Sequence, residues 1–70
     1  MREWLKAKRT EAGLTMKEMG DRLGISESYY SMIESGDRQK KMDVTLAAGL
    51  SVALNMPIAE VIACDNAPEA

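Results

Sequence analysis

The chain has 70 residues, of which 46% are hydrophobic, and nine Lys and Arg residues stand against eleven Asp and Glu, giving a formal net charge of −2. This length fits one domain, and the hydrophobic fraction is typical of a globular rather than a disordered chain. Because the sequence has no histidine and a single cysteine, Cys64, we expect no metal, no cofactor, no internal disulfide and no enzyme. The longest apolar run, from Leu46 to Leu54, is too short to cross a bilayer. We therefore expect a cytoplasmic protein with no membrane partner.

The first predicted helix covers residues 2–12 and ends at Gly13, a residue suited to the left-handed backbone that stops a helix. It carries many charges. The spacing of its residues predicts one shared face made by Met1, Leu5, Lys8 and Ala12.

A capping box starts the second predicted helix. Thr15 is the cap and Glu18 stands three residues later, so each side chain can bond the other's backbone amide. The helix is expected to run to about Leu23 and to stop at Gly24. Gly20 lies inside it at a cost of about 1 kcal/mol relative to Ala. We expect its small size to let the third helix approach closely.

The third predicted helix follows after only four residues, "LGIS", and is capped by Ser26. It is expected to end at Gly36. A short turn containing glycine makes two helices cross steeply, which is the helix-turn-helix arrangement. In such units the second helix of the pair enters the major groove of DNA.

Two further helices are predicted in the second half of the chain. Asp43 caps a fourth helix that extends to about Leu54, and Pro57 fits the first turn of a short fifth one. We therefore predict an all-α, compact five-helix bundle that spans residues 1–64. Residues 65–70 show no core pattern and are expected to form a frayed tail.

The charges are divided unequally along the chain. Residues 1–41 hold all nine basic residues and seven acidic ones, a net charge of +2, whereas residues 42–70 hold four acidic residues and no basic one. Any surface that binds an anion must therefore come from the first 41 residues.

The run "GLTMKEMGDRLGISESYYSMIESGDR" resembles the Cro/CI-type (xenobiotic-response-element) helix-turn-helix family, and "LAAGLSVALNMPIAEVI" resembles the fourth and fifth helices of that family. The similarity covers roughly residues 5–62. It implies a lambda-repressor-like fold and sequence-specific binding of double-stranded DNA as a dimer. A transcriptional regulator, repressor-like and of a phage or mobile-element type, is the function it suggests. It also implies a structural ion pair between Arg9 and Glu34.

The resemblance places the reading surface on the third helix. The positions expected to read bases are Glu27, Ser28, Tyr29 and Met32. Those expected at the phosphates are Met16, Lys17, Ser31, Arg38, Lys40 and Lys41. The usual arginine-to-guanine contact is missing because the third helix has no basic residue. The basic loop after this helix and Lys17 must then supply the positive charge.

A dimer on DNA is expected, and the candidate contacts are apolar residues of the fifth helix, namely Ile58, Val61 and Ile62. Some of these residues must face the core, and the remainder could make a small two-fold patch. One alternative stays open, a protein-interaction or antitoxin-like module on the same fold. In that case the Tyr and Met surface of the third helix would bind another protein.

Overall fold

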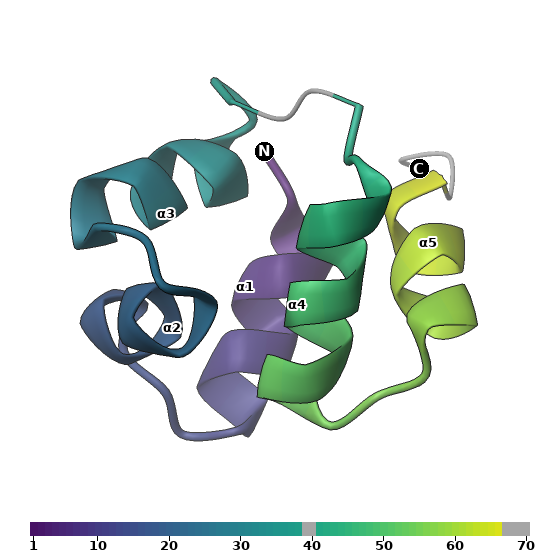
Figure 1. Ribbon diagram of the computed structural model, residues 1–70, viewed down its shortest axis with the longest axis horizontal. Helices are drawn as coiled ribbons and strands as arrows, with labels where there is room; N and C mark the ends of the chain where they lie inside the picture. Colours follow the sequence, from purple (N-terminus) through teal and green to yellow (C-terminus); the bar gives the residue numbers. More distant parts are fainter. Residues whose placement is uncertain (39–40, 67–70) are drawn as a thin grey trace.

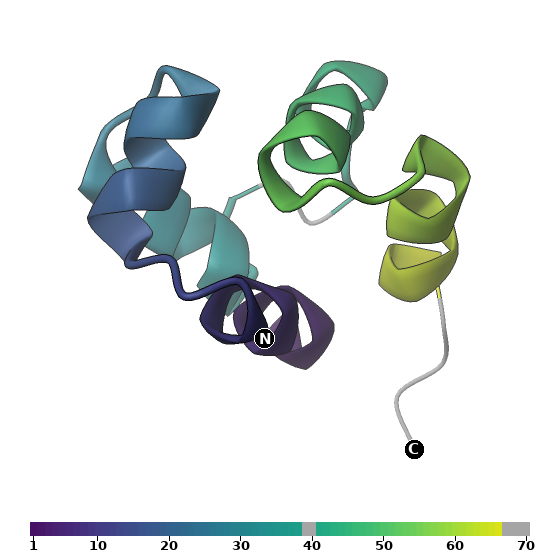
Figure 2. The same cartoon turned by 90° about the horizontal axis from the view of Figure 1, so that it is seen from below.

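The computed structural model describes residues 1–38 and 41–66, and these residues form five α-helices and no strand. The helices are α1 (Glu3–Glu11), α2 (Met16–Leu23), α3 (Glu27–Ser35), α4 (Val44–Leu54) and α5 (Ile58–Asn66). The predicted all-α fold is thus confirmed. In Figure 1, α1 and α4 lie between the α2–α3 pair and α5, and Figure 2 shows α1 and α4 on opposite sides of the fold.

The predicted caps set the starts of three helices. The Thr15 hydroxyl accepts from the Glu18 amide and the Glu18 carboxylate accepts from the Thr15 amide, both at 3.1 Å, so the capping box is complete. Ser26 accepts from the Tyr29 amide at 3.0 Å in the same way. Asp43 caps α4 through the Leu46 amide at 2.7 Å. These bonds satisfy amides that a helix end leaves without a backbone partner.

One apolar core joins all five helices. Its buried members are Leu5, Leu14, Met19, Tyr30, Ile33, Ala47, Leu50, Ala53 and Val61. Every helix contributes at least one of them, and Leu14 adds to the core from the turn before α2. A 70-residue domain buries only about 60% of its unfolded surface, so a single shared core is the economical arrangement.

The steep turn between α2 and α3 depends on two glycines. Gly24 closes α2 with a backbone φ of +72°, which a residue with a Cβ adopts only under strain. Gly20 lies where the next segment crosses α2, since a Cβ there would meet the Ile25 carbonyl oxygen at 2.9 Å and the Ser26 carbonyl at 3.2 Å. The expected close approach is therefore present.

The buried face of α1 differs from the expectation. Met1 and Ala12 are exposed and Lys8 is only half-buried, while Arg2, Leu5 and Arg9 are buried. The three buried positions also share one helical face, and the two arginines are accommodated there because each is hydrogen-bonded to groups of α3.

The end of the domain also differs. Helix α5 runs through Asp65 to Asn66, so the frayed tail predicted to begin at residue 65 does not begin there. Asp65 is held by an ion pair to Arg2 at 2.7 Å. Residues 67–70 lie outside the described part of the chain.

No single described helix has both the length and the apolar composition to span a membrane. Helices α4 and α5 meet these criteria only when taken together, and they are bent by 115° at the break between them.

We predict that Gly20→Ala destabilises the domain whereas Gly49→Ala is tolerated. Either change gains about 1 kcal/mol of helix propensity. At Gly20 the new methyl group meets fixed backbone, and such overpacking costs about 1–3 kcal/mol. At Gly49 it meets only the Leu23 Cδ2 atom, at 2.9 Å, and that side chain can move.

Urea unfolding followed by circular dichroism gives the free energy of unfolding of both variants. The free energy of unfolding of Gly20→Ala should be lower than that of the wild type and lower than that of Gly49→Ala. A Gly20→Ala protein as stable as the wild type would contradict the close approach.

Candidate nucleic-acid interface

Helix α3 has one buried side and one exposed side. Tyr30, Ile33 and Glu34 are buried. The four residues expected to read bases, Glu27, Ser28, Tyr29 and Met32, are all exposed. They occupy the opposite side and the first turn of the helix, which leaves them free to contact a ligand.

Tyr29 lines a groove of about 200 Å³ between α3 and the start of α4. The apolar part of the lining comes from Leu23, Ile25, Ile33 and Leu46. The Tyr29 side chain is 37% exposed. The apolar lining therefore supports the Tyr29 ring on one side. This contact restricts the rotamers of the side chain before binding, so less conformational entropy is lost when a ligand binds.

The residues expected at phosphates divide into two groups. Lys17, in the first turn of α2, is exposed, as are Arg38 and Lys41. Met16 is instead half-buried and packs against the core, and Ser31 is half-buried. The side chain of Met16 therefore belongs to the scaffold. Lys40 lies outside the described residues.

Arg38 is anchored to the end of α3 through its backbone. Its N–H donates to the Met32 carbonyl at 3.1 Å, and its own carbonyl accepts from Arg2 Nη1 at 3.3 Å. The side chain stays exposed. The loop thus presents this cation from a fixed backbone position.

The three dimer candidates do not share one environment. Val61 is fully buried in the core, so it is the candidate that faces the core and is not placed to meet a partner chain. Ile58 and Ile62 are 38% and 42% exposed and stand four residues apart on α5. That spacing puts them on one face of the helix.

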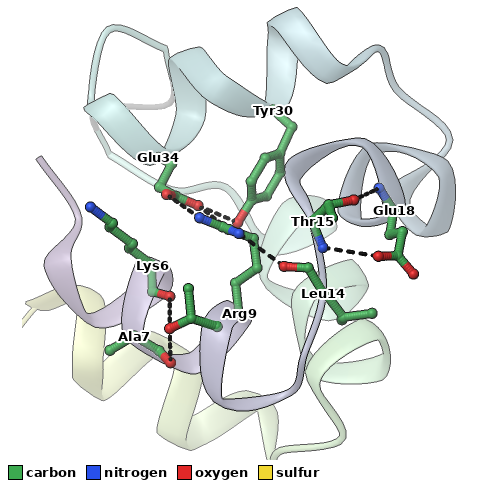
Figure 3. A network of polar contacts seen from close by, with 9 residues as sticks. Lys6, Ala7, Arg9, Leu14, Thr15, Glu18, Tyr30 and Glu34 are labelled. Carbon is green, nitrogen blue, oxygen red and sulfur yellow. Dashed lines mark hydrogen bonds and ion pairs between the residues drawn. The ribbon is translucent and has the colours of Figure 1, made fainter.

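A buried polar network fixes α3 against α1, as Figure 3 shows. Arg9 Nε donates to Glu34 Oε2 at 3.0 Å and Arg9 Nη2 to Glu34 Oε1 at 3.3 Å. The Tyr30 hydroxyl donates to Glu34 Oε2 at 2.7 Å, and Arg9 Nη1 donates to the Leu14 carbonyl at 2.9 Å. The ion pair that the family resemblance implied is thus one part of a larger network.

The network shifts the proton affinities of two of its members. Burial, together with the bond to the Glu34 carboxylate, raises the pKa of the Tyr30 hydroxyl well above its ordinary value. The same carboxylate raises the pKa of the Arg9 guanidinium, more than desolvation lowers it. Tyr30 therefore has two roles: its ring packs in the core, and its hydroxyl donates a hydrogen bond to Glu34.

A second buried arginine was missed in the sequence. Arg2 Nη1 donates to the Ile33 carbonyl at 2.6 Å and Nε to Asp65 at 2.7 Å. Trp4 Nε1 also donates to Asp65, at 3.3 Å. The available signal was the spacing of Arg2, Leu5 and Arg9, which puts both arginines on the face of the apolar residue.

We predict that Tyr30 makes stability fall at alkaline pH. An unfolded tyrosine ionises near pH ~10, whereas folded Tyr30 keeps its proton, so its contribution is complete below that pH and is lost above it. Tyr30→Phe should lower the free energy of unfolding by about 1 kcal/mol at neutral pH. Above pH ~10 the wild type should lose up to about 1.4 kcal/mol more per pH unit than this variant.

Urea unfolding measured at several pH values tests this, with Tyr29→Phe as the control at an exposed position. The control should keep the steep alkaline decline of the wild type. Parallel curves for the wild type and Tyr30→Phe would disprove the role given to Tyr30.

Within the described residues, no group of three or more His, Cys, Asp or Glu side chains is placed to hold a metal ion.

Comparison with known proteins agrees with this geometry. Residues 5–61 match the family model described as helix-turn-helix. A curated relative, the "uncharacterized HTH-type transcriptional regulator YqaF" of Bacillus subtilis (strain 168), is 36% identical over 58 residues, which cover 83% of this chain and 76% of that protein. No solved structure matches the chain. The chain belongs to the Cro/CI-type (xenobiotic-response-element) helix-turn-helix family of DNA-binding regulators.

Proposed function

We propose that the protein binds a specific double-stranded DNA site with α3 in the major groove and acts as a repressor-like transcriptional regulator. The observation that carries this proposal is the exposed side of α3 with cations at either end of the helix-turn-helix, Lys17 in α2 and Arg38 in the loop after α3. A helix of nine residues is long enough to present several side chains to one groove.

Sequence would be read by short polar and apolar contacts. Ser28 can donate to or accept from a base edge, and Met32 can pack against a thymine methyl group. Glu27 can accept from a cytosine amino group. The same carboxylate repels phosphates, so it penalises any register that brings the backbone near it. These contacts therefore contribute more to the sequence specificity of DNA binding than to its affinity.

Affinity would come from the phosphates. Lys17, Arg38 and Lys41 are exposed, whereas Arg2 and Arg9 are buried in the scaffold. Each phosphate that a cation neutralises releases counterions and makes binding depend on salt. Because each subunit has few such cations, a single subunit should bind DNA with modest affinity. Two subunits together should bind with an affinity that rises steeply as the salt concentration falls.

The second subunit would be recruited through α5. Ile58 and Ile62 are exposed on the same face, which is the kind of apolar pair that a two-fold interface duplicates. A dimer places two copies of α3 on two half-sites one helical turn apart. We therefore propose a palindromic site occupied by a homodimer.

The biological setting is proposed from similarity. The Bacillus subtilis relative is named a transcriptional regulator. The resemblance of the helix-turn-helix run to Cro/CI-type sequences points to control of a phage or mobile element, in the cytoplasm.

A second candidate function uses the same surface for a protein partner. The exposed Tyr29 and Met32 beside the apolar groove favour it, since aromatic and methionine side chains are enriched at protein interfaces. In this case binding would rest on apolar contacts, so it would respond little to salt.

We predict that charge reversal in the loop after α3 weakens DNA binding more than the same change on α1. Lys41→Glu should lower the affinity and reduce the salt slope by about 1 or more per subunit. Lys6→Glu, also at an exposed lysine, should act only through the overall charge. The assay is fluorescence anisotropy of a labelled, randomised duplex pool at several salt concentrations, with sequencing of the bound fraction.

Equal losses in the two variants would show attraction by net charge without a defined interface. If the wild type fails to bind at low salt, the DNA proposal is wrong and the protein-partner function becomes the one to pursue.

We also predict that Ile62→Glu separates dimer formation from folding. Because Ile62 is exposed, the free energy of unfolding should change by less than about 0.5 kcal/mol. Binding to the selected palindromic duplex should lose its two-to-one stoichiometry in analytical ultracentrifugation. Val44→Glu, at an exposed residue in the first turn of α4, is the control that should keep it.

A further inference from the structure

The C-terminal end of α3 is held by Arg2, the residue that precedes α1. The last carbonyls of a helix have no partner inside it, and cations near that end are favoured by the helix dipole. Helix α3 has no basic residue in its last turn. Arg2 supplies both functions, because its backbone N–H donates to the Glu34 carbonyl at 2.8 Å and its guanidinium to the Ile33 carbonyl at 2.6 Å.

The same guanidinium reaches the loop that follows α3. Arg2 Nη1 donates to the Arg38 carbonyl at 3.3 Å, while the Arg38 N–H is bonded to Met32. Both backbone groups of Arg38 are thus held, and the side chain remains exposed beside the proposed reading helix. Figure 1 shows the start of the chain next to the end of α3.

Arg2 is itself oriented by α5. Its Nε donates to Asp65 Oδ1 at 2.7 Å, and the two side chains are only 8% and 12% exposed. Trp4 donates to the same oxygen. Asp65 lies in the last turn of α5, where the helix dipole disfavours an acid, so a nearby cation is what makes this position acceptable.

We propose that Asp65 and Arg2 are positioning residues for DNA binding, through which α5 fixes the end of the reading helix and the backbone of Arg38. The inference rests on the proposed function and deepens it. Helix α5 also carries the proposed dimer contacts Ile58 and Ile62. The helix that sets the spacing between two subunits would then also set where each subunit presents its Arg38 cation to a phosphate.

The chemistry favours an arginine in this place. A planar guanidinium offers five N–H donors in a fixed fork, so one side chain can serve a carboxylate and two carbonyls at once. Lysine has a single charged atom and cannot hold these groups in fixed relative positions.

The test compares Asp65→Ala with Glu60→Ala. Both variants remove one acid from α5, so they change the net charge equally, but Glu60 is exposed in the first turn. On the selected duplex, well below the melting temperature, Asp65→Ala should lose about fivefold in affinity, the equivalent of one hydrogen bond. Its salt slope should fall by about 1 per subunit. Glu60→Ala should keep the wild-type slope.

Two further measurements separate positioning from mere stability. Arg38→Ala and Asp65→Ala should not be additive, because both remove the same phosphate contact. Amide hydrogen exchange of Arg38, measured without DNA, should be faster in Asp65→Ala than in Glu60→Ala. A purely structural role would lower the melting temperature but leave the slope unchanged.

If Asp65→Ala keeps the wild-type salt slope of DNA binding and the wild-type hydrogen exchange of the Arg38 amide, the positioning role is wrong. The proposed function would stand in that case, since the wild type would still bind DNA. A wild type that does not bind DNA would overturn the proposed function, and with it the role of Arg2 and Asp65 in DNA binding.

Discussion

A buried carboxylate on the proposed reading helix is the constraint on which this small domain depends. Glu34 is 1% exposed, and an unpaired charge at such a depth is strongly unfavourable. Its oxygens accept from Arg9 on α1 and from Tyr30 one turn earlier on α3. These bonds fix the rotation of α3, because the side of a helix that carries Glu34 must face α1. The opposite side, with Ser28 and Met32, is then turned outward.

The requirement to hold α3 also explains how the basic residues are used. Two of the nine, Arg2 and Arg9, are buried and bonded to carbonyls or carboxylates of other segments. Arg22 donates to the Ala53 carbonyl at 3.3 Å and joins α2 to α4. The cations left for an anionic partner are fewer than the composition suggests. A slightly acidic protein can still bind DNA in this way, because phosphate contacts depend on where cations stand and not on net charge.

The separation of roles within α3 follows from the same arrangement. The inner side is buried and joined to the polar network, so substitutions there would disturb the packing of α3 on the core. On the outer side Ser28 and Met32 are exposed, and Tyr29 borders the groove toward α4. In the proposed mode of binding, substitution of Ser28 or Met32 would change the DNA target while the scaffold is retained.

The amino-acid sequence by itself determined the local features. Five helices, the Thr15, Ser26 and Asp43 caps and the glycine turn at Gly24 were all predictable, because caps and glycine stops act over three or four residues. The exposure of Glu27, Ser28, Tyr29 and Met32 also followed from position in the helix-turn-helix run. What only the tertiary structure decided involves residues far apart in the chain.

The contact of Arg2 with Asp65 spans 63 positions, and no local pattern marks it. The burial of Val61 in place of a partner contact was likewise decided by the packing of α5 on α4. Periodicity identifies an apolar face on a short helix, but the neighbouring helices determine which of its residues are covered.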